Sequence, residues 1–458
     1  MHNLLDDALR ASRADYTDIR LERCWTAAVA YRGSRLEGAT SGFDLGGFVR
    51  CLNRGRGWGI ASFSGVEQLP AMVARAHELS LALPVERPIR LAEIHHRIQD
   101  TLADLDGDVR GVPLDEKRRL LEQLNQEMLA ADRRIVDTQA AYRDEVTERW
   151  FASSEGSRLY ELRSEITLSA VAVAREDSVV ERALESYAVR GGWRSVGEAA
   201  PLFRAAARRA VSLLAAPRVR PGTVPVVLDP RLAAALIHET IGHLSEADTL
   251  DTQPELAGLM RPGAQVAAPL LTIGDDGSAL GLRGSLPFDD EGTPTQNTLL
   301  VQNGVLVGRL HTRETAGRAG ERATGNARAL SYRHPPTVRL TNIYIANGQG
   351  SVEDLVRELP FGVYCCDALG GRVHRGRFVI TSAYGQMIRD GRLGELVKPV
   401  VLQGDIVETL NAVDAVAGDF RWTQLASGCG KLGQAPLPVA EGAPHLRLRA
   451  VRVGGETV

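Results

Sequence analysis

Apolar positions follow two different periods along this chain, and the change between them separates its first 220 residues from the rest. In the first part, apolar residues spaced three and four apart predict helices, and alternating apolar and polar residues predict strands. Two alternating runs are joined by a polar turn at residues 53–55, which predicts a hairpin. The predicted helices lie near 4–9, 69–76, 120–128 and 198–214, and the predicted strands lie at 19–22, 46–52, 58–63, 135–147 and 160–173.

From residue 223 onward, short runs rich in Val and Leu are interrupted by Gly, Asn and Asp, which is typical of strands joined by tight turns. Asn303-Gly304 and Asp390-Gly391 are strong hairpin signals. The pattern predicts an α+β protein, with N-terminal α/β units followed by a β-rich C-terminal domain. The strands predicted in this half are 223–228, 297–301, 304–310, 337–340, 377–380 and 446–453.

Two segments suggest where domains begin and end. Residues 83–113 are rich in Pro, Asp and Arg, and residues 216–222 read as a linker. A chain of 458 residues is also too long for a single core. We therefore expect an N-terminal α+β domain at 1–110, a central α+β domain at 111–220, and a β-rich C-terminal domain at 221–458.

Composition and charge exclude several classes of protein. A hydrophobic content of 44% and a charged content of 24% are ordinary for a soluble globular chain. The net charge of −3 and the lack of a basic block argue against a nucleic-acid partner. No apolar run approaches the roughly 20 residues that span a bilayer, and the start does not resemble a signal peptide. Five cysteines, an odd number, indicate reduced thiols and a cytoplasmic location.

The most informative motif is an HExxxH, in which His238 is followed by Glu239 and, five residues on, by His243. Two imidazoles and a carboxylate are the groups that hold zinc and deprotonate water. Asp229-Pro230 predicts the start of the helix that carries them. A spacing of five rotates the second His by roughly 140° in a regular α-helix. A shared metal therefore requires that the helix either end between the histidines or widen locally, as in a π-type turn, and Gly242 lies where such a distortion would cost least.

A catalytic zinc site usually has three protein ligands, so a third is needed. Glu246 lies three residues beyond His243, where a continuing helix would place it on the same face. His311 lies in a short polar segment, and Cys429 lies in a loop flanked by glycines. The residues alone leave these three candidates open. The vicinal Cys365-Cys366 pair cannot easily direct both sulfurs at one ion and is expected to serve packing.

Taken together, these segments resemble the TldD/PmbA family of metallopeptidases, whose members are also described as modulators of DNA gyrase. The resemblance covers residues 223–458 firmly and the first 220 residues more weakly. The motifs identify the family only when they are taken together, and none of them does so alone. The matching segments are HETIGHLSEAD at 238–248, DDEGTP at 289–294, TGN at 324–326, SY at 331–332, RLTN at 339–342 and CGKLGQ at 429–434.

The resemblance implies a zinc-binding helix in the C-terminal domain, with His238, His243 and Cys429 as ligands to Zn²⁺ and Glu239 as general base. Because all four residues are present, the chain resembles the catalytic, TldD-like subunit. A heterodimer with a motif-less sister subunit (TldE/PmbA-like) is implied, and a homodimer is the alternative. One departure is Tyr384, where relatives often have Glu, and it bears on substrate preference.

We therefore predict a zinc peptidase that hydrolyses unfolded or flexible peptides, which bind as an extended strand at a sheet edge near the metal. His311 and Tyr332 are candidate contacts to the substrate or the oxyanion. One alternative is a non-catalytic binding subunit with a structural metal, which needs a fourth protein ligand such as Glu246. Another is a zinc hydrolase that tailors one peptide-like metabolite, because the same residues would serve it.

Overall fold

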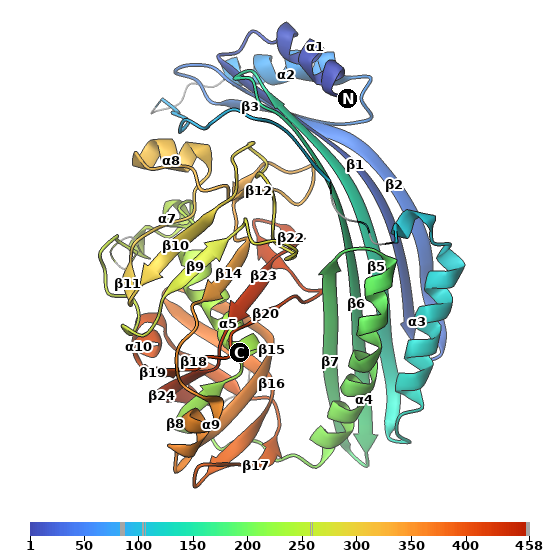
Figure 1. Ribbon diagram of the computed structural model, residues 1–458, viewed down its shortest axis with the longest axis vertical. Coiled ribbons are helices and arrows are strands. Elements are labelled where there is room, and N and C mark those ends of the chain that lie inside the picture. Colours follow the sequence, from blue (N-terminus) through green and yellow to red (C-terminus); the bar gives the residue numbers. More distant parts are fainter. Residues whose placement is uncertain (83–87, 103–104, 106, 257, 259, 455–458) are drawn as a thin grey trace.

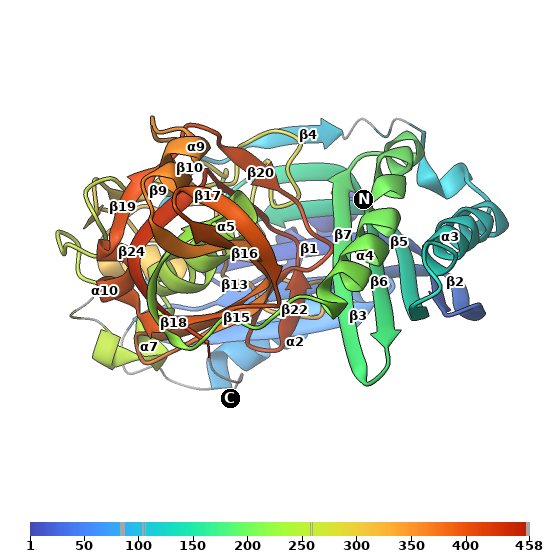
Figure 2. The same cartoon turned by 90° about the horizontal axis from the view of Figure 1, so that it is seen from below.

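A curved sheet and a β-rich C-terminal half face one another in the computed structural model, which describes residues 1–82, 88–102, 105, 107–256, 258 and 260–454 (Figure 1). The predicted α+β class is confirmed. The helices of the first 214 residues lie at the end and outer side of the sheet, and the longest α-helix of the C-terminal half, at Pro230–Ile237, runs inside that half (Figure 2). The interface between the two parts is where the charged residues discussed below gather.

The first sheet has seven strands in the order β3-β2-β1-β5-β6-β4, with β7 also paired to β6. Neighbouring strands are antiparallel except β4, which is parallel to β6. Its strands are β1 (Tyr16–Arg32), β2 (Arg35–Leu52), β3 (Trp58–Ser64), β4 (Ile98–Leu102), β5 (Ile135–Ser153), β6 (Arg158–Glu176) and β7 (Val179–Arg190).

The two faces of this sheet differ because side chains alternate along each strand. Between residues 166 and 174, the even-numbered residues of β6, such as Ile166 and Leu168, are apolar and belong to the core cluster that includes α3 (Leu114–Leu129) and α4 (Ala200–Leu214). A second apolar cluster lies under α1 (His2–Ala11) and α2 (Leu69–Ala82). Odd-numbered residues of β6, such as Arg163 and Thr167, line a cavity toward the C-terminal half. The sheet therefore turns a polar face toward the region that carries the motif.

The C-terminal half contains two main sheets. A six-stranded sheet has the order β11-β10-β9-β14-β23-β20, and in a seven-stranded sheet the pairing of β15 with β16 closes a ring with β8, β24 and β18. The strands of the six-stranded sheet are β9 (Ile273–Asp276), β10 (Asn297–Gln302), β11 (Val305–Leu306), β14 (Asn342–Ile345), β20 (Arg421–Thr423) and β23 (Ala440–Ala443). Those of the seven-stranded sheet are β8 (Gly222–Leu228), β15 (Phe361–His374), β16 (Arg377–Arg389), β17 (Arg392–Val397), β18 (Val401–Asp405), β19 (Val413–Val416) and β24 (Leu446–Val453).

Helix α5 (Pro230–Ile237) contributes to the apolar core shared by these two sheets. Two short hairpins complete the half, β12 (Ala327–Arg328) with β13 (Thr337–Val338) and β21 (Cys429–Lys431) with β22 (Gln434–Leu437). The remaining short helices are α6 (His243–Ser245), α7 (Thr249–Thr252), α8 (Arg313–Ala319), α9 (Val352–Arg357) and α10 (Ile406–Asn411).

The segment at residues 289–292, which we call the acidic turn, connects the C-terminal half to the first sheet. Asp290 Oδ1 lies 3.1 Å from Arg20 Nη1 and 2.5 Å from Arg149 Nη1, and all three residues are buried. Glu291 Oε1 accepts a hydrogen bond of 2.8 Å from Arg50 Nη1. The DDEGTP segment of the sequence is thus a buried contact between the two parts of the fold.

Most predicted elements are present, and several bounds differ. The hairpin of β2 with β3 is confirmed, but β1 and β2 extend much farther than predicted because their polar residues are also paired. The predicted strand at 304–310 is wrong beyond Leu306, since the amides of Val307 and Gly308 both bond to the Leu300 carbonyl and the chain turns away. Strand β13 likewise ends at Val338 rather than at 340, and β15 was not predicted.

The predicted boundary segment 83–113 lies partly outside the described residues (83–87, 103–104 and 106). Within it, Ile98–Leu102 forms β4 and pairs with β6. Strands from both residues 1–110 and residues 111–220 therefore share one sheet. The proposed division into three domains stays a prediction.

The chain has three lysines, and all of them form ion pairs. Lys117 Nζ lies 2.6 Å from Asp144, and Lys398 Nζ lies 2.6 Å from Glu181. The third, Lys431, belongs to the site described next. In the described part of the chain, no helix combines the length and apolarity that a membrane crossing requires.

Candidate metal centre

The two histidines of the motif come together because the helix widens between them. Asp229 begins α5, where its Oδ1 accepts a hydrogen bond of 2.8 Å from Leu232 N. Residues His238–Gly242 then form a π-helical turn, and His243 starts α6. The two imidazole rings lie 5.0 Å apart, centroid to centroid. The predicted π-type turn is confirmed, and it gives residues five apart a common face.

Gly242 has a different role from the one expected of it. Its backbone is ordinary right-handed helix, with φ −55° and ψ −66°, so conformational freedom is not what the position requires. A Cβ at this position would lie 2.9 Å from both Ile343 Cδ1 and Leu340 Cδ1. Glycine is therefore needed because the π turn packs directly against the side chains of Leu340 and Ile343 of the same polypeptide.

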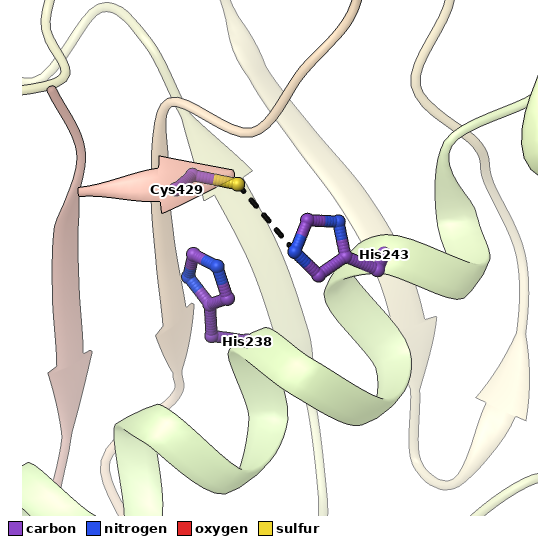
Figure 3. A group of neighbouring side chains, drawn as sticks. All are labelled: His238, His243 and Cys429. Atoms are coloured by element: carbon purple, nitrogen blue, oxygen red, sulfur yellow. Dashed lines mark hydrogen bonds between the residues drawn. The ribbon is translucent and has the colours of Figure 1, made fainter. Parts of the chain in front are cut away.

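Cys429 reaches the histidines from β21, almost 190 residues away in sequence (Figure 3). Its Sγ lies 3.4 Å from His243 Nε2. The ligand-type atoms of His238, His243 and Cys429 all lie within 4.8 Å of one another. Two imidazole nitrogens and a sulfur at this spacing can hold one metal ion.

Carboxylates lie behind both histidines. Glu246 Oε2 is 3.2 Å from His243 Nδ1, the ring nitrogen opposite the one that faces Cys429. Glu441 Oε1, from β23, is 2.9 Å from His238 Nδ1. Partners of this kind orient metal-binding imidazoles and raise their basicity. The histidine ligands are thus held by carboxylates from two separate segments.

Lys431 links the cysteine hairpin to the histidine helix. Its Nζ lies 2.9 Å from Glu246 Oε2 and 2.5 Å from Asp248 Oδ1, and it also donates to the Val338 carbonyl. Because Glu246 also contacts His243, one carboxylate joins the two parts of the site. Lys431 lies two residues after Cys429, so this ion pair fixes the hairpin that supplies the sulfur.

A buried arginine fixes the same hairpin from the other side. Arg339 is fully buried and donates hydrogen bonds to the Cys429 carbonyl at 2.8 Å and the Gln434 carbonyl at 3.2 Å. Hydrogen bonds from a charged donor are stronger than neutral ones. The backbone of Cys429 is therefore positioned independently of any metal.

Without a metal, the cluster favours a thiolate paired with protonated imidazoles, so a metal ion that binds here displaces protons from the histidines. Burial acts to raise the pKa of the Cys429 thiol, but His238 and His243 outweigh it and lower that pKa well below its ordinary value. Burial lowers the pKa of His243, whereas Glu246 and Cys429 raise it to about 10. Thiolate is the form of cysteine that binds metal. The site stabilises that form even when no metal neutralises it.

Glu239 stands on the wall of a cavity of about 490 Å³ that His238 and Glu441 also line. Burial raises the pKa of its carboxyl, while the two histidines act to lower it. A Cβ on Gly371 would lie 3.1 Å from Glu239 Cγ, so the backbone of β15 passes directly beside the carboxylate arm. A carboxyl group with a raised pKa in a cavity is suited to accepting and returning a proton.

The cavity lies between the first sheet and the C-terminal half. Ser169 of β6 and Ser186 of β7 line one side, and residues 368–371 of β15 line the other. A register shift between Ala368 and Gly370 interrupts the pairing of β15 with β16 at this point. His238 and Glu239 therefore face a space bounded by two sheets.

The other residues singled out in the sequence lie elsewhere. Glu246 supports His243 and is not among the three clustered ligands. The His311 ring is buried between Thr315 and Glu321, and Tyr332 donates a hydrogen bond of 3.0 Å to Asp44 in a neighbouring cavity. Neither lines the cavity that contains Glu239, so their positions give no support to an oxyanion role there.

The remaining positions are accounted for by packing. Tyr384 stacks on the Arg209 guanidinium at 4.3 Å and is not part of the wall near Glu239. Cys365 and Cys366 are both buried, as expected of packing residues. Sequence reasoning missed Glu441 and the role of Lys431. Lys431 stands within the CGKLGQ segment, which offered a signal, whereas nothing local to Glu441 distinguishes it.

Comparison with known proteins places this geometry in a family. Models of the PmbA/TldA metallopeptidases match domain 1 at residues 17–80, the central domain at 107–214 and the C-terminal domain at 221–455. The chain belongs to the PmbA/TldD family. Within this family it is 38% identical to a metalloprotease of Synechocystis, over 97% of this chain and 96% of that relative.

Two further relatives extend the comparison. A zinc metalloprotease TldD homolog of Saccharolobus solfataricus is 30% identical over 69% of this chain and 70% of its own length. The solved structure of TldE from Thermococcus kodakarensis has a TM-score of 0.78 at 19% identity and covers 99% of both chains. The latter likeness shows a shared PmbA/TldD fold. The resemblance inferred from the motifs is thus confirmed, and the relatives named metalloproteases indicate the class of activity.

Proposed function

We propose that this chain is a zinc-dependent peptidase of the TldD type that hydrolyses unfolded or flexible peptides. The observation that carries the proposal is the cluster of His238, His243 and Cys429. Glu239 follows the first of these ligands and lines a cavity. The relatives named metalloprotease, one of them a zinc metalloprotease, support the same reading.

The donor set fits zinc. Zinc accepts nitrogen and sulfur ligands, and its catalytic sites usually have three protein ligands rather than the four of structural sites. Among the described residues, the cluster has three members, and the nearby Glu246 contacts the far nitrogen of His243. His238, His243 and Cys429 would hold the ion. When bound, zinc supplies Lewis acidity, which polarises a carbonyl group and eases the deprotonation of water.

In this proposal Glu239 is the proton carrier. Its carboxylate accepts a proton from the attacking water and then returns it to the leaving amine of the peptide. The raised pKa brings the carboxyl closer to neutral pH, where both steps are efficient. Gly370 and Gly371 leave the wall beside it without side chains, so a peptide main chain can approach closely.

The strand arrangement supports an extended substrate. Strand β8 pairs with β15 only at residues 363–365, while residues 368–371 of β15 line the cavity. An extended peptide can add to such a strand through main-chain hydrogen bonds, which suits many sequences. A cavity of about 490 Å³ admits a single chain and excludes a folded domain.

We further propose that the chain assembles with a motif-less TldE/PmbA-like sister subunit, or with a second copy of itself. The support is the shared fold with TldE. Light scattering on the chain alone, and on the chain mixed with a TldE-like protein from the same source, distinguishes these assemblies. A heterodimer of one chain each is the expected result, and a mixture that stays as two separate species would contradict it.

The test of the peptidase function is Glu239→Gln. We expect the variant to keep one zinc per chain and to lose about 10²- to 10⁴-fold in kcat on a mixture of unfolded peptides, because the proton acceptor is gone. Metal content by mass spectrometry and product formation by chromatography provide the two readouts. The exposed Glu395→Gln is the matched control and should behave as wild type. Normal turnover by Glu239→Gln would contradict the assigned role.

A further inference from the structure

A second cavity of about 560 Å³ adjoins the one beside the metal centre. Ala426 lines both cavities, and the same face of β6 runs through them, with Arg163, Glu165 and Thr167 in the second and Ser169 in the first. The linings of the two cavities thus meet at Ala426 and along this face of β6. We call the second space the arginine cavity because six arginines line it, namely Arg143, Arg149, Arg163, Arg190, Arg283 and Arg328.

Three of the six have carboxylate partners. Arg149 lies 2.5 Å from Asp290 Oδ1, Arg283 lies 2.9 Å from Glu165 Oε1, and Arg143 lies 2.9 Å from Glu145 Oε2. Their charges are balanced within the fold. These three arginines therefore need no ligand to explain them.

The other three are not matched in this way. Arg328 is buried and donates only to carbonyl oxygens, those of Leu340 at 2.5 Å and Pro438 at 2.7 Å. Arg190 donates to the carbonyl of Arg283, and its closest carboxylate contact, to Glu161, is long at 3.9 Å. Among the described residues, Arg163 has no hydrogen bond or ion pair from its side chain. Within the part of the chain that the structure describes, these three guanidinium groups thus form no short ion pair, although five carboxylates also line the cavity, namely those of Glu22, Asp44, Glu145, Glu165 and Asp290.

Their mutual influence shows that these charges are close together. Burial lowers the pKa of Arg190 to about 10, and Arg163 and Arg149 contribute to the lowering. Burial lowers the pKa of Arg328 to about 9, and Arg339, Arg163 and Arg190 add to it. Burial also acts to lower the pKa of Arg163, but Glu161 and Glu145 outweigh it and keep that pKa raised. Arg163 is therefore firmly charged and open to a partner.

We propose that the arginine cavity binds a carboxylate group of the peptide substrate, with Arg163 as the principal contact and Arg190 and Arg328 providing the positive field. This inference rests on the peptidase function proposed above. Arginine is suited to the role because its planar fork matches a carboxylate with two parallel hydrogen bonds. Both a free C-terminus and an Asp or Glu side chain offer that group.

The spacing predicts how far the carboxylate lies from the metal cavity. Arg163 and Ser169 are six residues apart on β6, which corresponds to about 20 Å of strand. An extended peptide covers that distance with about six residues. Substrates should therefore be anchored by a carboxylate several residues away from the part of the peptide that lies at Glu239.

The test compares three ten-residue peptides. Two have the same sequence and end in a free carboxylate or in a carboxamide. The third also ends in a carboxamide and differs by a glutamate as its penultimate residue. Their affinity for zinc-loaded Glu239→Gln protein is measured by fluorescence anisotropy, which does not depend on turnover. We expect the plain carboxamide to bind about 10- to 100-fold more weakly than the free carboxylate. Recovery by the glutamate peptide would identify a side-chain carboxylate as sufficient.

Arg163→Gln, combined with Glu239→Gln, should abolish the difference between the peptides, and Arg163→Lys should retain part of it. Arg389→Gln, which removes one exposed arginine on β16, is the matched control and should retain all of it. Equal binding of all three peptides to the protein with Arg163 intact would overturn the proposal. Carboxylate-dependent binding without cleavage by the chain with Glu239 intact would instead refute the peptidase function and leave this site standing.

Discussion

The metal centre and the acidic turn both bury charged groups between segments that are distant in sequence. They differ in whether those groups have their partners within the protein. In the acidic turn, the fold itself supplies a partner for each carboxyl group: Asp290 meets Arg20 and Arg149, and Glu291 meets Arg50. The buried Asp289 carboxyl accepts hydrogen bonds from the backbone N–H groups of Glu291, Thr293 and Ala327. In the metal centre, the ligand atoms of the two imidazoles and of Cys429 converge within 4.8 Å of one another, and carboxylates contact only the outer nitrogens of the two rings.

This difference separates a structural from a chemical use of buried polarity. A cluster whose charges are all matched contributes specificity to the fold and has nothing left for a ligand. A cluster whose nitrogen and sulfur atoms converge on one point can instead give them to a metal ion. Both segments belong to the motifs that define the family resemblance, so resemblance alone does not distinguish them. The comparison predicts which substitutions will affect folding and which will affect metal binding.

The largest effect is expected for Asp290→Asn. Removing this carboxylate leaves Arg20 and Arg149 buried without their shared partner, which should reduce the free energy of unfolding by about 3–5 kcal/mol. Urea denaturation of the wild type and the variant measures it. Zinc content of the variant that remains folded should stay at one per chain. A variant of unchanged stability would show that the turn is not the contact we describe.

Acid provides the control for that variant. Burial would raise the pKa of Asp290, but Arg20 and Arg149 outweigh it and hold the pKa at about 2. Because the pKa is lower in the folded than in the unfolded chain, the carboxylate stabilises the fold above about pH 4. That stabilisation is lost as the pH falls toward 2. Asp290→Asn should lack this part of the acid dependence.

The opposite pattern is expected for Cys429→Ala. Loss of the thiolate should weaken zinc binding by more than about 100-fold, since a ligand matters more than an outer partner, whose loss costs about 10- to 100-fold. The stability of the metal-free protein should change by less than the Asp290 effect. Competition with a chromophoric chelator measures the affinity. Zinc retained at wild-type affinity would move the third ligand to another residue.

A smaller effect is expected for Lys431→Met, which tests the link between the cysteine hairpin and His243. The side chain keeps most of its volume but no longer pairs with Glu246 and Asp248. Zinc affinity should fall by about 10- to 100-fold, as for other partners of ligands. Lys398→Met, which breaks the ion pair with Glu181, is the matched control and should bind zinc as wild type does. Equal affinity in both variants would contradict the positioning role.

Much of the chemistry was visible in the sequence because it is local. The Asp229 cap, the helix after it and the π turn are set by residues within one short segment. Cys429 was one of three open candidates until the family resemblance selected it, and the fold brings it to the histidines. Glu441 could not have been found, since it approaches His238 from β23 across the core.

The parts of the fold that were missed share a physical cause. Strands β1 and β2 contain polar residues on the face turned toward the C-terminal half, so hydrophobic alternation marks only part of their length. The arginine cavity draws on several strands and loops, and no spacing in the sequence joins them. Local patterns predict elements, whereas the balance of charges between distant segments depends on the assembled fold.

The burial of lysine in ion pairs has a consequence for chemical labelling. Lys117, Lys398 and Lys431 are the three lysines of the sequence, and each lies in an ion pair. An amine-directed reagent should therefore modify Lys431 only when its contacts with Glu246 and Asp248 open. The rate of labelling at Lys431 would then report, at a single residue, how often the cysteine hairpin separates from the histidine helix.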